Sequence, residues 1–161
     1  MTVAITLGLE ACDTTDSVDR VFTGKEQSYR LVSASDYNIQ GMATFQEKAD
    51  GELQLTLQLE NTVSGGLHPA HMHYGTVDVP DSEMALMLTP VEGATGTSVT
   101  TFSSLLDGSP FTFADLLDFD GSVKVHLDDG ANSKVVLCGA NIGRNETTDA
   151  STITVCSTDL P

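Results

Sequence analysis

Leucine at every second position is the feature that most constrains what this chain can fold into. In "GELQLTLQLEN", residues 51–61, polar residues alternate with Leu53, Leu55, Leu57 and Leu59. Side chains of a β-strand point alternately to its two faces, so the leucines share one face. A helix would instead need apolar residues three and four positions apart. The pattern predicts a half-buried strand of an antiparallel sheet.

Several other segments carry strand signals. "SYRLVSA" predicts a first strand, and "NIQGMATFQEKADG" predicts a second that turns at residues 49–51 into the leucine strand as a hairpin. The later runs are short and β-branched, and Gly, Asp and Asn turns separate them. They are "TSVTTF", "SVKVHL", "KVVLCGANI" and "STITVC". "PDSEMALMLTP" fits either a helical turn or a strand.

One segment predicts a short helix. In "SPFTFADLLDFDG", Thr112 is the expected N-cap and Asp115 follows it three residues later. With the strands around it, this indicates an all-β fold, an antiparallel Greek-key sandwich or flattened barrel of seven to eight strands. The length of 161 residues fits one such domain, which we place at residues 21–161.

The net charge excludes some classes of partner. Seven Lys and Arg residues against 23 Asp and Glu residues give a net charge of −16. Such a surface repels phosphate backbones and anionic lipid headgroups. We therefore expect no nucleic-acid partner, and membrane contact only through a lipid anchor. The protein partner is not indicated.

Residues 1–20 have the order of a bacterial lipoprotein signal followed by an acidic spacer. A short apolar run precedes Cys12, with Leu9 three positions before it and Ala11 directly before it. The resemblance implies lipidation of Cys12 and an exported, lipid-anchored protein of the bacterial cell envelope, periplasmic or on the surface. The alternative is a tail with an incidental cysteine.

The other two cysteines are Cys138 and Cys156. Export would place them in an oxidising compartment, where they can form a disulfide. Such a bridge would stabilise the fold by roughly 3 kcal/mol in the chain-entropy description. The alternative is two buried free thiols.

The histidines form the candidate functional site. Three of the four lie within "GGLHPAHMHYG", residues 65–75. Alternation puts His71 and His73 on one face of a strand, where they can share a metal ion. His68 either turns toward this pair or makes a structural hydrogen bond. His126 joins the pair only if its own strand lies beside them.

Imidazoles without a cysteine pair suit copper or zinc best. Met84 and Met87 follow in the sequence, and their thioethers either bias the site toward Cu(I) or belong to the core. Residues 128–130, "DDG", are interpreted as a turn.

Several segments of the chain resemble segments of known families. "GGLHPAHMHYG" is similar to the copper-site strand of the Cu/Zn superoxide dismutase family, and "VKVHLDDGANSKVVLCGANIG" is similar to its late segment. The order "HMH", "PVEGATGTS", "VKVH" and "GANIG" more closely resembles the CHRD domain of bacterial envelope proteins. The resemblance covers about residues 36–145 and implies a superoxide dismutase-like β-sandwich.

The resemblance also implies roles for individual residues. It makes His71, His73 and His126 copper ligands and gives His68 a supporting position beside the metal. Cys138 matches a cysteine that forms a disulfide in the dismutase family, and its partner here would be Cys156. The two-metal dismutase site needs six histidines and an aspartate, whereas this chain has four histidines. The complete enzyme site therefore cannot be built.

Three functions follow in order of preference. The first is an exported envelope domain that binds one copper ion through His71, His73 and His126, with zinc as the alternative metal. The second is a structural or adhesive envelope β-domain without a metal. The third is a copper enzyme that acts on superoxide, and the acidic surface argues against it because it repels an anionic substrate.

Overall fold

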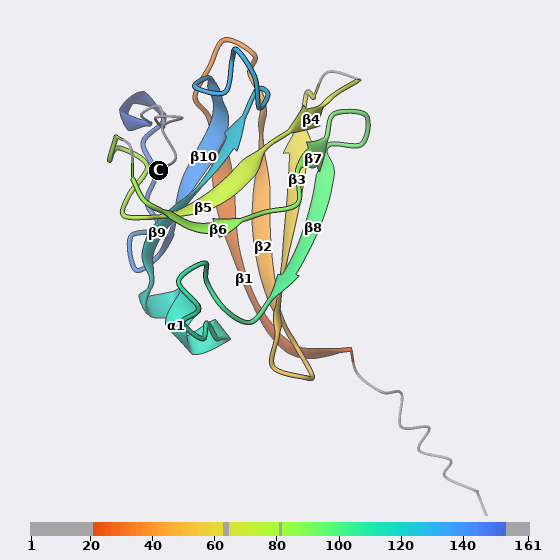
Figure 1. The fold of residues 1–161 in the computed structure, drawn as a ribbon, viewed down its shortest axis with the longest axis vertical. Helices are drawn as coiled ribbons and strands as arrows, with labels where there is room; N and C mark the ends of the chain where they lie inside the picture. Colours follow the sequence, from red (N-terminus) through yellow and green to blue (C-terminus); the bar gives the residue numbers. More distant parts are fainter. Residues whose placement is uncertain (1–20, 63–64, 81, 154–161) are drawn as a thin grey trace, which may run out of the picture.

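The structure is a computed structural model that describes residues 21–62, 65–80 and 82–153. These residues form ten β-strands, one α-helix and one short 3₁₀-helix (Figure 1). In chain order they are β1 (Phe22–Ser33), β2 (Gln40–Lys48), β3 (Leu53–Glu60), β4 (Leu67–His68), β5 (Ala70–Tyr74), β6 (Met84–Met87), β7 (Val91–Glu92), β8 (Thr97–Phe102), α1 (Phe113–Asp118), β9 (Asp120–His126), β10 (Val136–Gly143) and η1 (Ala150–Thr152).

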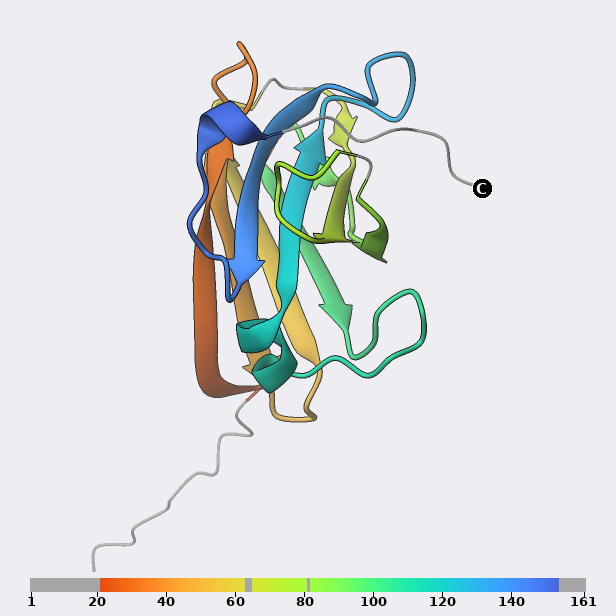
Figure 2. The ribbon, with the colours of Figure 1, turned by 90° about the vertical axis from the view of Figure 1, so that its left-hand side faces the viewer.

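The strands form one antiparallel sheet that curls back over itself. Its strand order is β4-β7-β8-β3-β2-β1-β10-β9-β5-β6. Strand β1 joins the two halves: most of its length pairs with β2, while Val32 and Ser33 at its end pair with β10. Figure 2 shows the two layers facing each other, with β9, β10 and β5 in front of β1, β2 and β3. The core lies between these layers.

The predicted all-β antiparallel class is confirmed, but the predicted number of strands is too low. Two of the ten strands, β4 and β7, contain only two residues each, which is too short for alternation to reveal. The first of them is separate from β5 because Pro69 has no backbone N–H to donate to a ladder. The ambiguous segment around residues 80–90 contains a strand, β6.

The predicted strand at "STITVC" is wrong at its start. Ser151 and Thr152 belong to η1, where the Asp149 carboxylate accepts a hydrogen bond from the Ser151 backbone N–H at 2.9 Å. Local side-chain-to-backbone bonding of this kind competes with a strand ladder. The remainder of the segment lies outside the described residues.

The leucine row is buried as its alternation predicts. Leu53, Leu55 and Leu57 are fully buried and Leu59 is 5% exposed, while the polar residues between them lie on the outer face. Strand β3 pairs with β2 through the predicted hairpin. Gly51 closes the turn with φ +89°, a conformation that glycine adopts without a Cβ clash. The apolar area buried here anchors one layer of the core.

The predicted helix is confirmed with its cap. The Thr112 hydroxyl accepts a hydrogen bond from the Asp115 backbone N–H, and the Asp115 carboxylate accepts one from the Thr112 backbone N–H at 2.8 Å. This capping box satisfies backbone donors that the first helical turn leaves unpaired. Buried Leu116 fixes the helix against the core, and β9 follows directly.

The predicted disulfide stays a prediction, because one of its two cysteines lies outside the described residues. Cys138 is a free thiol, fully buried among the apolar core side chains, and burial raises the pKa of this thiol to about 12. Its predicted partner, Cys156, lies outside the described residues, as do Cys12 and the rest of residues 1–20. Within the part of the chain that the structure covers, no helix has the length and apolar character of a membrane span.

Replacing Thr112 with Ala should lower the free energy of unfolding by about 1 kcal/mol. The variant loses the two hydrogen bonds of the threonine hydroxyl, one accepted from the Asp115 backbone N–H and one donated to the Asp115 carboxylate. Urea denaturation followed by circular dichroism measures this change. Asp118→Ala is the matched control: it removes an acidic side chain from the C-terminal turn of the same helix, where a negative charge is unfavourable. Equal destabilisation by the two substitutions would contradict the role of the cap.

Candidate metal centre

The histidine site is built by the pairing of β5 with β9. In this antiparallel ladder Met72 lies opposite Val123, and both are fully buried in the core. Because alternate residues point to opposite faces, His71 and His73 lie on the outer face of this layer. The prediction that His71 and His73 share one face of the strand is therefore confirmed, and Met72 points to the opposite face.

His126 reaches the same face from the end of β9. It follows Lys124 by two residues, and Lys124 lies directly opposite His71. The backbone N–H of His126 donates to the Pro69 carbonyl at 2.8 Å, which continues the contact between the two strands. The strand of His126 therefore lies beside "HMH", as is required for His126 to join the pair.

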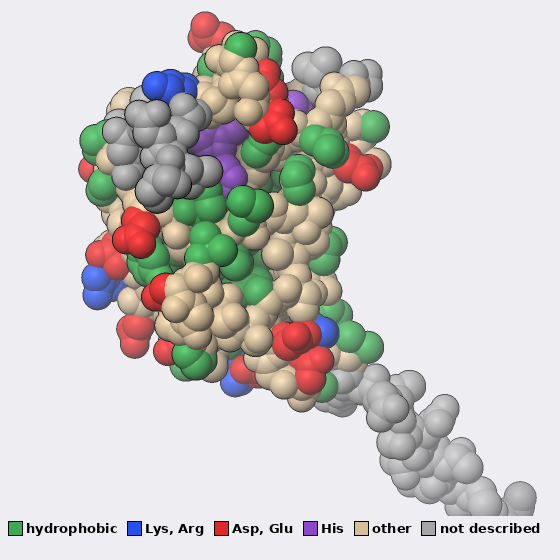
Figure 3. Space-filling model, in the orientation of Figure 1, with side chains coloured by type: hydrophobic (Ala, Val, Ile, Leu, Met, Phe, Trp, Pro, Cys, Tyr) green, Lys and Arg blue, Asp and Glu red, His purple; other side chains and the backbone are tan. Residues whose placement is uncertain are grey.

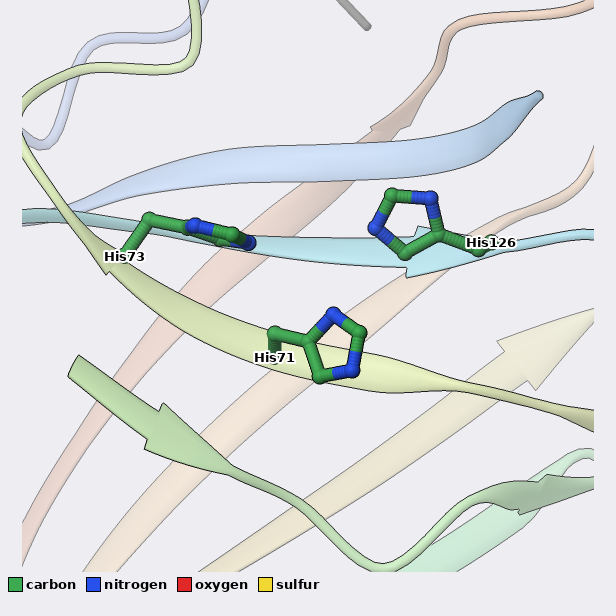
Figure 4. Close-up of side chains that lie close together, drawn as sticks. All are labelled: His71, His73 and His126. Carbon is green, nitrogen blue, oxygen red and sulfur yellow. The ribbon is translucent and has the colours of Figure 1, made fainter. Parts of the chain in front are cut away.

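The three imidazoles converge. One possible ligand nitrogen from each of His71, His73 and His126 lies within 4.8 Å of the other two. The ring centroids of His71 and His126 are 5.3 Å apart, and those of His71 and His73 are 5.8 Å apart. Figure 4 shows the rings pointing toward one another from β5 and β9. These three side chains are close enough to hold a metal ion.

A backbone carbonyl orients one of the rings. The Nδ1 atom of His73 lies 2.9 Å from the carbonyl oxygen of Ser82. A carbonyl only accepts, so Nδ1 carries the proton and donates, and Nε2 of the neutral ring holds the lone pair. Metal-bound histidines are commonly oriented by such a contact. The sequence contains no signal for it, because the group that acts is a backbone atom of a loop.

His126 is buried with its polar atoms unsatisfied. The residue is 3% exposed, and within the described part of the chain neither ring nitrogen forms a hydrogen bond. The Ser133 backbone acts to raise the pKa of the ring, but it makes no hydrogen bond of ordinary geometry with it. A buried polar group without a partner costs roughly 1–3 kcal/mol. Coordination of a cation by one of these nitrogens would offset part of that cost.

The environment keeps the imidazoles neutral. Burial, followed by the neighbouring His126 and His73, lowers the pKa of His71 to about 4. Burial, followed by the charge of His73, lowers the pKa of His126 to about 4 as well. The pKa of His73 is also lowered, again chiefly by burial. Neutral imidazoles offer their lone pairs, which is the state that metal binding requires.

Lys124 lies beside the histidine group, and no sequence pattern marked this residue as functional. It is fully buried on the histidine face, and its Nζ donates to the Val79 carbonyl at 3.4 Å. Its positive charge contributes to the lowered pKa values of His73 and His126. Alternation placed it on this face, but nothing in the sequence showed that a loop covers it.

His68 is not part of the group. It is 5% exposed, and its Nδ1 donates to the Leu127 carbonyl at 2.9 Å. Of the two roles that the sequence left open for it, the structure shows the structural hydrogen bond. The interpretation of residues 128–130 as a turn also holds, because the Asp128 carboxylate accepts from the Gly130 backbone N–H at 2.9 Å.

The donor set limits which ions fit. The group that the described residues form contains three imidazoles and no carboxylate or thiolate. Imidazole suits copper and zinc, whereas calcium and magnesium prefer oxygen ligands. One side of the group is reachable, because His71 is only partly buried and histidine side chains are visible at the surface in Figure 3.

Comparisons with known proteins add no relationship to this geometry: no protein-family model, no curated protein and no solved structure matches the chain.

The stability of the metal-free protein should fall as the pH decreases from 6.5 to 4. The folded pKa values of His71 and His126, about 4, lie below the ordinary value of 6.5, so the unfolded chain binds more protons in this window. Each imidazole then contributes up to about 1.4 kcal/mol of lost stability per pH unit. Urea denaturation in the presence of a chelator measures the slope.

The double variant His71→Gln, His126→Gln is the control, because glutamine is polar but does not titrate. Carboxylates titrate in both proteins, so the difference between the two slopes isolates the histidines. Parallel slopes would show that these rings are not held neutral by the fold.

Proposed function

We propose that this protein binds one copper ion through His71, His73 and His126. The observation that carries the proposal is the convergence of three ligand nitrogens within 4.8 Å from two paired strands. The unsatisfied nitrogens of buried His126 and the carbonyl that orients His73 support it. A polar network without a metal, as in a structural or adhesive domain, would be expected to pair the nitrogens of His126.

Copper is preferred over zinc on two grounds. A given site of nitrogen donors binds Cu²⁺ more tightly than Zn²⁺. The resemblance of "HMH" and "VKVH" to CHRD and superoxide dismutase-like segments also assigns these histidines to copper. On this proposal the domain is a CHRD-like relative of the superoxide dismutase sandwich.

We place the function in binding or handling copper at the cell envelope rather than in catalysis. Four histidines cannot supply the six that a two-metal dismutase site needs. The net charge of −16 repels superoxide, so the surface does not guide that substrate toward the metal. Export and lipid anchoring at Cys12 are part of the same proposal and rest on the order of residues 1–20.

Adding copper should raise the thermal stability of the wild-type protein. It should not change the thermal stability of the double variant His71→Ala, His73→Ala. A ligand that binds only the folded state at one hundred times its Kd stabilises by about 2.7 kcal/mol. Thermal unfolding with and without copper tests this, and a parallel titration with zinc ranks the metals. Circular dichroism of the double variant verifies that it folds. If the double variant does not fold, the single variant His71→Ala replaces it in the test, because His71 is the most exposed of the three histidines.

His68→Gln is the matched control, because it removes a histidine that lies outside the group and should preserve the response to copper. If wild type and the double variant respond to copper alike, the proposed site is wrong. If wild type does not respond to copper or zinc, the metal-free structural role replaces the proposal.

Cys12→Ser should abolish lipid labelling and release the protein from the membrane fraction. Only a thiol at this position can carry the lipid in a lipoprotein signal. Metabolic labelling with a palmitate analogue in a bacterial host, followed by fractionation, measures both. Cys138→Ser is the control, and equal labelling of wild type and Cys12→Ser would contradict the anchor.

A further inference from the structure

The edge strand β6 lies on the other side of β5 from β9. It pairs with β5 so that Met87 is opposite His71 and Met84 is opposite His73, with a bulge between these two pairs. Directly opposite residues of an antiparallel ladder project to the same face, with Cβ atoms about 4.5–5.5 Å apart. Two thioether side chains therefore start beside the histidine group.

Met87 is on the histidine face and not in the core. Its neighbour Leu86 is 8% exposed and lies opposite buried Met72, whereas Met87 is 59% exposed. The pairing and the exposure thus agree on the direction of Met87. Figure 3 shows apolar side chains next to the histidines on this surface. Packing in the core does not account for a large apolar side chain at this position.

Met87 lies beside the solvent-accessible side of the histidine group, and its side chain is flexible enough to reach it. Its partner across the ladder, His71, is the most exposed member of the histidine group. A methionine side chain is unbranched and has three rotatable bonds, so an exposed one can swing its sulfur toward a neighbouring site. Met84 is more buried and lies next to the bulge, which makes Met87 the freer of the two.

A thioether changes which ion the site prefers. Soft sulfur ligands select Cu(I), whereas zinc and Cu(II) bind well to imidazole alone. Three neutral imidazoles and a thioether add no negative charge to balance a doubly charged ion. The group that the described residues form also contains no carboxylate.

We propose that Met87 supplies a thioether ligand to the copper ion held by His71, His73 and His126, and that it makes the site selective for Cu(I). This inference rests on the proposed copper site and specifies the oxidation state that the site takes.

The test compares the affinities of the full chain for Cu(I) and Cu(II). Cu(I) is measured anaerobically with ascorbate against the chelator bicinchoninate, and Cu(II) is measured against a Cu(II) chelator. Met87→Leu removes the proposed ligand and should weaken Cu(I) binding at least about tenfold, with little change for Cu(II), because even the loss of a group that only orients a ligand commonly costs tenfold or more. X-ray absorption of the Cu(I)-loaded protein should show a sulfur neighbour in wild type and none in the variant.

Met42→Leu is the matched control, since Met42 is a 40% exposed methionine on β2, in the other layer. If Met87→Leu and Met42→Leu bind Cu(I) equally well, the inference is overturned, while the loss of binding in His71→Ala, His73→Ala still supports the copper site. A sulfur neighbour that persists in Met87→Leu and disappears in Met84→Leu overturns the assignment of Met87. A wild-type protein that binds neither copper ion overturns both proposals.

Discussion

The histidine group depends on the register in which β5 pairs with β9. A shift of one residue would turn His71 and His73 into the core and Met72 out to solvent, because alternate side chains of a strand face opposite ways. The register is held by the apolar face, where Met72 meets Val123 inside the core. The site on one face of the sheet is thus positioned by hydrophobic packing on the other face.

Burial on the outer face has two opposite effects on the site. It lowers the pKa values of His71 and His126 to about 4, which keeps their lone pairs available to a metal ion. It also leaves the nitrogens of His126 without a hydrogen-bond partner among the described residues, at a cost in stability. A coordinated metal ion would bind to the available lone pairs and would offset part of the cost of the unpaired nitrogens. The three convergent imidazoles are close enough to hold a metal ion, and copper is the ion that we propose.

Sequence patterns predicted the elements that have a strong period or a local signature. The leucine alternation of β3, the turn at Gly51 and the capping box at Thr112 each depend on residues close together in the chain, and each is confirmed. The errors have physical causes as well. Strands β4 and β7 are too short to show a period, and local hydrogen bonding at Asp149 forms η1 where a strand was expected. The disulfide between Cys138 and Cys156 stays a prediction, because Cys156 lies outside the described residues.

The sequence by itself determined that His71 and His73 share a face, because that follows from alternation within one strand. By the same alternation, it determined that Lys124 shares a face of β9 with His126. Only the tertiary structure decided that β9 lies beside β5, that His68 bonds instead to Leu127, and that Ser82 orients His73. These contacts join residues that are far apart in the chain or use backbone atoms, and neither kind leaves a local pattern. Strand order is set by how the whole core packs.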